Sequence, residues 1–185
     1  MEERFKTAMI SNPYKIVITG PESTGKTTLA EQLAAHYKGD FAPEYARTYV
    51  ENLQRPYVFD DVEIIAKKQL ADYLAYEKSG NRFVFFDTYL IITKVWFDVV
   101  FKQCPKWITE HLQNCKVDLF LVCNTDIPWV PDPVRENGGE MREELFQLYI
   151  NELNNFNLKY FIIKGEGDER LSSAIKTIDR ILVTH

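Results

Sequence analysis

Residues 20–27 read Gly-Pro-Glu-Ser-Thr-Gly-Lys-Thr, a full match to the pattern G-x-x-x-x-G-K-[ST]. The apolar run Ile16-Val17-Ile18 leads into this segment, and an amphipathic stretch leads out of it. Glycines at positions 20 and 25 permit backbone angles that a Cβ would strain, so successive N–H groups can converge on phosphates. The segment predicts a strand, a phosphate-binding loop (the P-loop) and a helix in direct succession. A chance Gly-rich turn would not require the fixed lysine and threonine.

The residue types of this loop also predict a nucleotide with magnesium. A helix that begins near Lys26 adds its positive dipole end to the phosphate site. Lys26 is expected to reach the β- and γ-phosphates, and the Thr27 hydroxyl to ligate Mg²⁺. The predicted ATP-binding residues are Gly20, Glu22, Ser23, Thr24, Gly25, Lys26, Thr27 and Thr28.

Short β-rich runs alternate with longer helical stretches over the rest of the chain, which is typical of an α/β fold with a parallel sheet. Strands are predicted at 15–19, around 40–42, and at 82–86, 117–122 and 160–163. Two of these runs are continuously apolar, as strands covered on both faces should be. We expect a three-layer α/β/α P-loop NTPase fold with a mainly parallel five-stranded sheet. It forms one domain over residues 15–185, after an N-terminal extension over 1–14.

Helices are predicted over 27–37, 60–78, 90–102, 105–114, 140–155 and 168–182, with Pro105 as a first helical residue. In the second, Val62, Ile65, Leu70 and Leu74 form the apolar face. The third is apolar nearly all round, which predicts a deeply buried helix, or alternatively a dimer surface over 95–101. The segment 124–139 holds three prolines and two glycines and is predicted to be a loop.

Composition narrows the class of partner. The chain has 22 basic and 27 acidic residues and a formal net charge of −5, which argues against broad binding of a nucleic-acid backbone. No apolar run reaches the ~18–20 residues of a membrane span, and the start lacks a signal-peptide core. The three cysteines, without C-x-x-C spacing, predict reduced thiols, so we expect a cytoplasmic protein. The expected partners are small molecules, and a homo-oligomer is left open.

A second acidic signal follows the predicted strand Phe83-Val84-Phe85-Phe86, which ends on Asp87. At the carboxyl end of a parallel strand, Asp87 can hold magnesium through water or deprotonate a substrate hydroxyl. Capping of the following helix is the alternative role. A guanine-reading motif fails because position 127 is isoleucine, and the acidic pair of AAA-type ATPases fails because Thr88 follows Asp87. A small-molecule kinase remains.

Such a kinase needs an acceptor pocket, a base and a cationic lid. The run Glu44-Tyr45-Ala46-Arg47-Thr48-Tyr49 follows the second strand, where an acceptor site would open. Glu44 or Asp87 can take the hydroxyl proton, Arg47 can bind phosphate or steady Glu44, and Tyr45 and Tyr49 can line an aromatic slot. Arg135 and Arg142 flank a glycine pair and are predicted to stabilise the transferring phosphoryl group from a mobile lid. Surface ion pairs and core packing are the alternatives for these side chains. Asn124 and Thr125 are weaker candidates for the adenine end.

These motifs together resemble the ribosylnicotinamide kinase domain of the NadR family. The resemblance runs from about residue 15 to 181 through the P-loop, Glu44-Tyr45-Ala46-Arg47, Phe86-Asp87-Thr88, and Trp129-Val130-Pro131-Asp132-Pro133-Val134-Arg135. It implies ATP-dependent phosphorylation of nicotinamide riboside at its 5′-hydroxyl, to give nicotinamide mononucleotide. It also places Trp129 among the substrate-binding residues.

Two departures from the family pattern matter. Only fourteen residues precede the first strand, which predicts that this chain does not carry out the family's adenylylation step. The family's tryptophan before Glu-Tyr is Pro43 here, so Tyr45, Tyr49 or Tyr73 would have to supply the aromatic face for the pyridinium ring. Two rivals stay open: a kinase for another nucleoside or small alcohol, and a P-loop ATPase that acts as a regulatory module.

Overall fold

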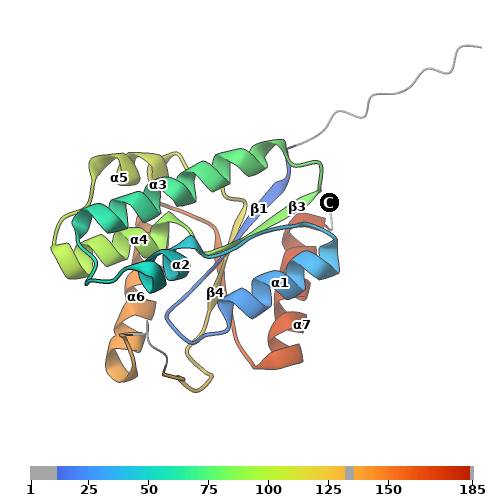
Figure 1. The fold of residues 1–185 in the computed structure, drawn as a ribbon. Coiled ribbons are helices and arrows are strands. Elements are labelled where there is room, and N and C mark those ends of the chain that lie inside the picture. Colours follow the sequence, from blue (N-terminus) through green and yellow to red (C-terminus); the bar gives the residue numbers. More distant parts are fainter. Residues whose placement is uncertain (1–11, 132–135, 184–185) are drawn as a thin grey trace, which may run out of the picture.

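A five-stranded parallel sheet lies at the centre of the protein (Figure 1). The computed structural model describes residues 12–131 and 136–183. The strand order is β2-β3-β1-β4-β5, and every pairing is parallel. The bounds are β1 Tyr14–Thr19, β2 Asp40–Ala42, β3 Phe83–Asp87, β4 Leu119–Cys123 and β5 Tyr160–Ile163. The predicted five-stranded α/β fold is confirmed, with strand boundaries within about two residues of those expected.

Two helix layers cover the sheet because its inner strands are apolar on both faces. Along β1, Ile16 and Ile18 belong to one core and Val17 to the other, the period of two that strands impose. The first core packs against α1 (Lys26–Tyr37) and α7 (Gly167–Ile178). The second packs against α3 (Phe59–Ala75), α4 (Leu90–Trp96), α5 (Lys106–Gln113) and α6 (Gly139–Asn155).

Helix ends differ from the expected ranges in three places. The predicted helix 60–78 ends as α3 at Ala75 and continues as a 3₁₀ turn, Tyr76–Lys78. The predicted helices 90–102 and 168–182 end in π-helical turns, Phe97–Phe101 and Asp179–Val183. Pro105 precedes α5 as its N-cap. A further helix, α2 (Tyr45–Asn52), was not predicted, because eight residues are too few to show a repeated helical period.

Two burial predictions are wrong. Leu74 was expected on the core face of its helix but is 49% exposed, because the buried face of α3 runs through Ile65, Gln69 and Tyr73 and Leu74 lies outside it. The prediction of a deeply buried helix over 90–102 also fails at Val100, which is 46% exposed, and the alternative of a dimer surface over 95–101 stays a prediction. All three cysteines are free thiols, with Cys123 buried and the other two half-buried. Over the described part of the chain, no helix combines the length and apolarity that crossing a bilayer requires.

Candidate nucleotide-binding and acceptor site

The P-loop joins the central strand β1 to α1 at the carboxyl edge of the sheet. Gly20 has φ +137°, and a Cβ on it would lie 2.7 Å from the backbone oxygen of Cys123 at the end of β4. Gly25, the N-cap of α1, has φ +72°. Both glycines are therefore required by the backbone, the first also by its close approach to the neighbouring strand.

Side chains inside the loop hold one of its carbonyl groups. The Lys26 Nζ donates to the Pro21 oxygen at 2.8 Å, and the Thr24 Oγ1 donates to the same oxygen at 2.8 Å. Lys26 thus lies at the mouth of the loop, within reach of a phosphate that would replace the carbonyl as its partner. Thr28, which follows on α1, is exposed.

Asp87 meets the P-loop directly. The Thr27 Oγ1 donates to Asp87 Oδ2 at 2.5 Å, although the two residues are 60 positions apart in the chain. Asp87 is 2% exposed, and burial raises the pKa of its carboxyl while the Thr27 hydroxyl and the Lys26 charge lower it. Its second oxygen, Oδ1, is buried without a hydrogen-bond partner among the described residues. The alternative role as a helix cap does not apply, since the N-cap of α4 is Tyr89.

A small hollow opens on the other side of Asp87. Its lining includes Ala42, Pro43, Tyr45, Phe86 and Thr88. It is the place between β2 and β3 where the sequence predicted an acceptor site.

Glu44 is the N-cap of α2 beside this hollow. Burial raises the pKa of its carboxyl. The charges of Lys26 and Arg47 lower that pKa, and those of Asp87 and Glu22 raise it. The structure therefore brings the predicted residues Glu44, Lys26 and Asp87 into one electrostatic group.

The remaining predicted acceptor residues have other partners. Arg47 forms an exposed ion pair with Glu51 at 2.9 Å, and the Tyr49 hydroxyl donates to Asp61 at 3.0 Å. Tyr45 lines the hollow, with the Lys68 ammonium 5.5 Å from its ring centroid. Tyr73 is 2% exposed and stacks on Tyr89, so it cannot supply an aromatic face to a ligand.

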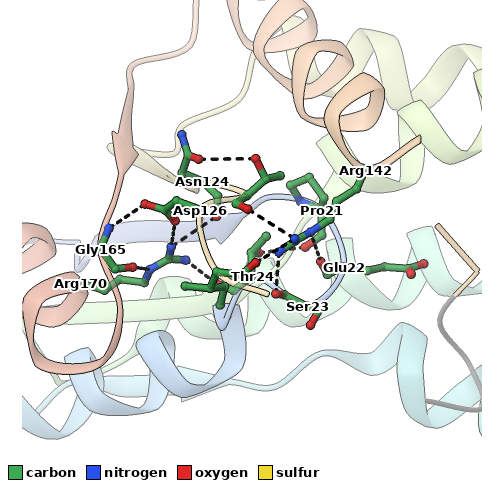
Figure 2. Close-up of polar contacts among 11 residues, drawn as sticks. Pro21, Glu22, Ser23, Thr24, Asn124, Asp126, Arg142, Gly165 and Arg170 are labelled. Carbon is green, nitrogen blue, oxygen red and sulfur yellow. Dashed lines mark hydrogen bonds and ion pairs between the residues drawn. The ribbon is translucent and has the colours of Figure 1, made fainter. Parts of the chain in front are cut away.

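The expected lid is placed differently from the prediction. Arg142 does not belong to a mobile segment: it is 5% exposed on the first turns of α6, and its guanidinium binds backbone carbonyls of the P-loop (Figure 2). The physical reason is that α6 packs its inner face into the core and carries Arg142 with it. Arg135 lies outside the described residues. The Trp129 ring packs against Gly138, and its indole N–H is buried without a partner within the described ranges.

The P-loop residues Glu22 and Ser23 hold the loop that follows β4. The Glu22 carboxylate accepts from the Asn137 backbone N–H at 3.0 Å and from the Asn137 side chain at 2.9 Å. The Ser23 Oγ accepts from the Val130 N–H at 2.9 Å. Asn124 and Thr125 lie at the start of the same loop, half-buried.

Arg170 is the residue that sequence reasoning missed. It lies in the first turn of α7, where the positive end of the helix dipole disfavours a cation. It is nevertheless 4% exposed, and its guanidinium reaches the P-loop (Figure 2). The unfavourable position of an arginine so close to a helix start was the only signal available in the sequence.

Fold and site together define the class of protein. A parallel sheet with a glycine-bearing loop after its central strand, a lysine at the loop mouth and a threonine–aspartate pair beside it are the parts of a P-loop nucleotide-binding protein. A family model described as an AAA domain matches residues 15–170, and the chain belongs to that family. In this member the strand β3 ends on one acid, Asp87, followed by Thr88.

Individual relatives indicate a narrower group of P-loop proteins. The chain is 24% identical over 175 residues to the trifunctional NAD biosynthesis/regulator protein NadR of Salmonella typhimurium, a match covering 90% of this chain and 42% of that protein. A crystal structure of NadR protein in complex with NR superposes with a TM-score of 0.78 at 26% identity, over 94% of this chain and 52% of the other. A structure of NadR protein in complex with NAD and AMP-PNP superposes with a TM-score of 0.76 at 27% identity, over 94% of this chain and 50% of the other. The resemblance to NadR inferred from the motifs is confirmed, and the chain spans about half the length of these relatives or less.

Proposed function

We propose that this chain is an ATP-dependent kinase that transfers the γ-phosphoryl group to the 5′-hydroxyl of nicotinamide riboside. The observation that carries the proposal is the position of Asp87. One of its oxygens accepts from the P-loop residue Thr27, and the same side chain lines the hollow at β2 and β3. A carboxylate shared by a nucleotide loop and a neighbouring pocket suits transfer between two ligands. The NadR structures with NR and with AMP-PNP support the choice of those ligands.

Magnesium fits the oxygen atoms that the site offers. Mg²⁺ prefers hard oxygen ligands and is usually held by one or two protein groups, with waters and phosphates completing the octahedron. The Thr27 Oγ1 and the Asp87 carboxylate are such groups, and the unpartnered Asp87 Oδ1 leaves a buried acceptor to satisfy. Bound there with ATP, the ion would neutralise charge on the β- and γ-phosphates.

Glu44 is the residue we assign as the base. Asp87 already accepts from Thr27, and its charge is needed beside the metal. Glu44 stands next to the hollow with a raised pKa, which brings a carboxylate closer to neutral pH, where general bases work best. Lys26 would bind the transferring phosphate, and Tyr45 would offer its ring to the pyridinium in place of the tryptophan that Pro43 replaces.

The test is a panel assay of ADP release. Purified chain with ATP and Mg²⁺ is given nicotinamide riboside, each of the ordinary nucleosides, or no acceptor, and the product is identified by mass. We expect turnover to depend on nicotinamide riboside, and Lys26→Ala to abolish it. Equal turnover without any acceptor would favour a regulatory ATPase and refute the proposal. Turnover with another nucleoside alone would keep the kinase and change its substrate.

We also propose that the reaction takes place in the cytoplasm. Three free thiols suit a reducing compartment, and the curated relatives are named for NAD biosynthesis. The net charge of −5 argues against broad binding of a nucleic-acid backbone, whereas a small anionic ligand needs only a local positive pocket. Fractionation of the source cells, followed by detection of the chain, tests this placement.

A further inference from the structure

Two buried arginines from opposite helix layers contact the P-loop backbone (Figure 2). Arg142 belongs to α6, which packs on one face of the sheet, and Arg170 to α7, which packs on the other. Their side chains are 5% and 4% exposed. Neither residue is part of the P-loop motif, yet both form hydrogen bonds with its backbone.

Arg142 spans two consecutive carbonyl groups of the loop. Its Nε donates to the Glu22 oxygen at 3.0 Å, and its Nη2 donates to the Ser23 oxygen at 2.8 Å. Its Nη1 donates to the Ile127 oxygen at 2.9 Å, in the loop after β4. The planar fork of a guanidinium can serve several acceptors at once, which the compact ammonium of lysine cannot do in the same geometry.

Arg170 takes the next carbonyl along the chain. Its Nη1 donates to the Thr24 oxygen, and its Nε donates to the Gly165 oxygen at 2.6 Å. Its Nη2 donates to the Asn124 oxygen at 3.3 Å and forms an ion pair with Asp126. Asp126 in turn accepts from the Gly165 backbone N–H at 2.8 Å, so Arg170 is held from both sides.

The three carbonyls are consecutive, and this fixes the direction of three amides. In a trans peptide the C=O and the N–H of one plane point in opposite directions. The oxygens of Glu22, Ser23 and Thr24 therefore belong to the same planes as the N–H groups of residues 23, 24 and 25. Holding those oxygens on the outer side turns the three N–H groups inward, toward the place of the phosphates.

We propose that Arg142 and Arg170 are positioning residues that preorganise the P-loop amides for the phosphates of ATP. They also explain how Ser23 keeps its φ of +56°, a left-handed conformation that is unfavourable for a residue with a Cβ. Arg142 binds the Glu22 and Ser23 carbonyls, which belong to the peptide planes on either side of the Ser23 Cα, so the strained residue is fixed on both sides. The inference rests on the proposed function only for its ligand, ATP, and not for the acceptor.

The experiment compares Arg142→Lys and Arg170→Lys with the wild type by calorimetric titration with ATP, ADP and AMP. Lysine keeps the positive charge and removes the fork, so only the positioning effect is tested. We expect the Kd for ATP and for ADP to rise at least about tenfold in each variant, a loss on the order of one charged hydrogen bond. The Kd for AMP, which lacks the β- and γ-phosphates, should change less than about threefold.

Arg180→Lys is the matched control, because the Arg180 guanidinium carbon lies 5.2 Å from the centroid of the Phe161 ring, to which its contact is a cation–π interaction. It should leave all three Kd values within about twofold of the wild type. An unchanged Kd for ATP in both folded variants would overturn the proposal, as would an equal loss for AMP. The panel assay can fail for nicotinamide riboside while these titrations succeed, so the two proposals fail separately.

A measurement on the unaltered protein covers the case in which a variant does not fold. Nitrogen-15 spectra should show the Nε–H signals of Arg142 and Arg170 at neutral pH, slowed in exchange with water by burial and hydrogen bonding. Rapid exchange of both signals would show that the guanidinium groups do not hold the loop, and would overturn the proposal without any substitution.

Discussion

Adding a Cβ to a glycine can cost free energy in two ways, through a left-handed φ and through a forced contact, and four glycines of this chain carry these costs in different combinations. At Gly20 both costs are present, since φ is +137° and the new carbon would lie 2.7 Å from a backbone oxygen. At Gly25 φ is +72°, but the nearest contact is an ordinary 3.7 Å to the Ile127 side chain. At Gly39 the Cβ would lie 2.6 Å from the Phe83 oxygen without a left-handed φ, and at Gly80 neither cost is present.

The expected loss of unfolding free energy follows from this arrangement. A left-handed conformation costs a non-glycine residue about 1–2 kcal/mol. A forced contact with backbone that must shift costs about 1–3 kcal/mol. Gly25→Ala should therefore lose about 1 kcal/mol, Gly39→Ala about 2 kcal/mol, and Gly20→Ala about 3 kcal/mol or more. Gly80→Ala should stay within about 0.5 kcal/mol of the wild type.

Urea unfolding of the four variants measures these differences. With a slope of about 2 kcal/mol per molar urea, a loss of 3 kcal/mol lowers the midpoint by about 1.5 M. ATP titration then gives an independent ordering, because only Gly20 and Gly25 lie in the P-loop. Gly39→Ala should lower stability while leaving the Kd for ATP within about twofold. The reasoning would be refuted if Gly20→Ala were as stable as, or more stable than, Gly25→Ala and Gly39→Ala.

Three further predictions concern the chemistry of the site. Thr27→Ala should raise the Mg²⁺ concentration for half-maximal activity at least about tenfold, measured by titrating the metal in the ADP-release assay, and an unchanged value would remove Thr27 from the metal site. Glu44→Gln should lower kcat about 10²-fold or more and flatten the acid limb of the pH profile of kcat. A general base is active only when deprotonated, so in the wild type kcat should fall as the pH falls through the raised pKa of Glu44. If Asp87→Asn alone flattened that limb, Asp87 would be the base. Cys115, whose pKa burial raises to about 11, should be alkylated at pH 8 roughly 100-fold more slowly in the native than in the urea-unfolded chain, and equal rates would contradict that pKa.

Local signals account for what the sequence predicted correctly. The P-loop, the strand that ends on Asp87 and the five apolar strand runs are each contiguous in the chain, so their chemistry is visible in a short window. The rule that ligands gather at the carboxyl ends of parallel strands predicted Asp87 at the edge of the sheet that carries the P-loop, and the structure adds its direct hydrogen bond with Thr27. The same rule led to Glu44, whose role as the base of the acceptor site stays a prediction.

Long-range contacts account for what the sequence did not predict. Arg142 binds residues 119 and 120 positions away, and Arg170 binds one 146 positions away. Nothing near either arginine distinguishes a side chain that holds a carbonyl from one that would reach a phosphate. The helix α2 was missed for a different reason, since its eight residues are fewer than the window of about 11–18 residues in which a helical period can be recognised.

The two halves of the site are held in different ways, and this has a consequence for specificity. The nucleotide half is fixed by buried groups from both helix layers, through Arg142 and Arg170. The proposed acceptor half begins at Pro43 and Glu44 and continues into α2, all eight residues of which are described and none of which is fully buried. Apart from Tyr49, which donates to the buried Asp61, the residues of α2 belong to neither core, so substitutions there can change the proposed acceptor site without loosening the phosphate loop. Pro43, which stands where the family has a tryptophan, lies at the start of this half, so under the proposed function its replacement changes the acceptor geometry and leaves the P-loop contacts in place.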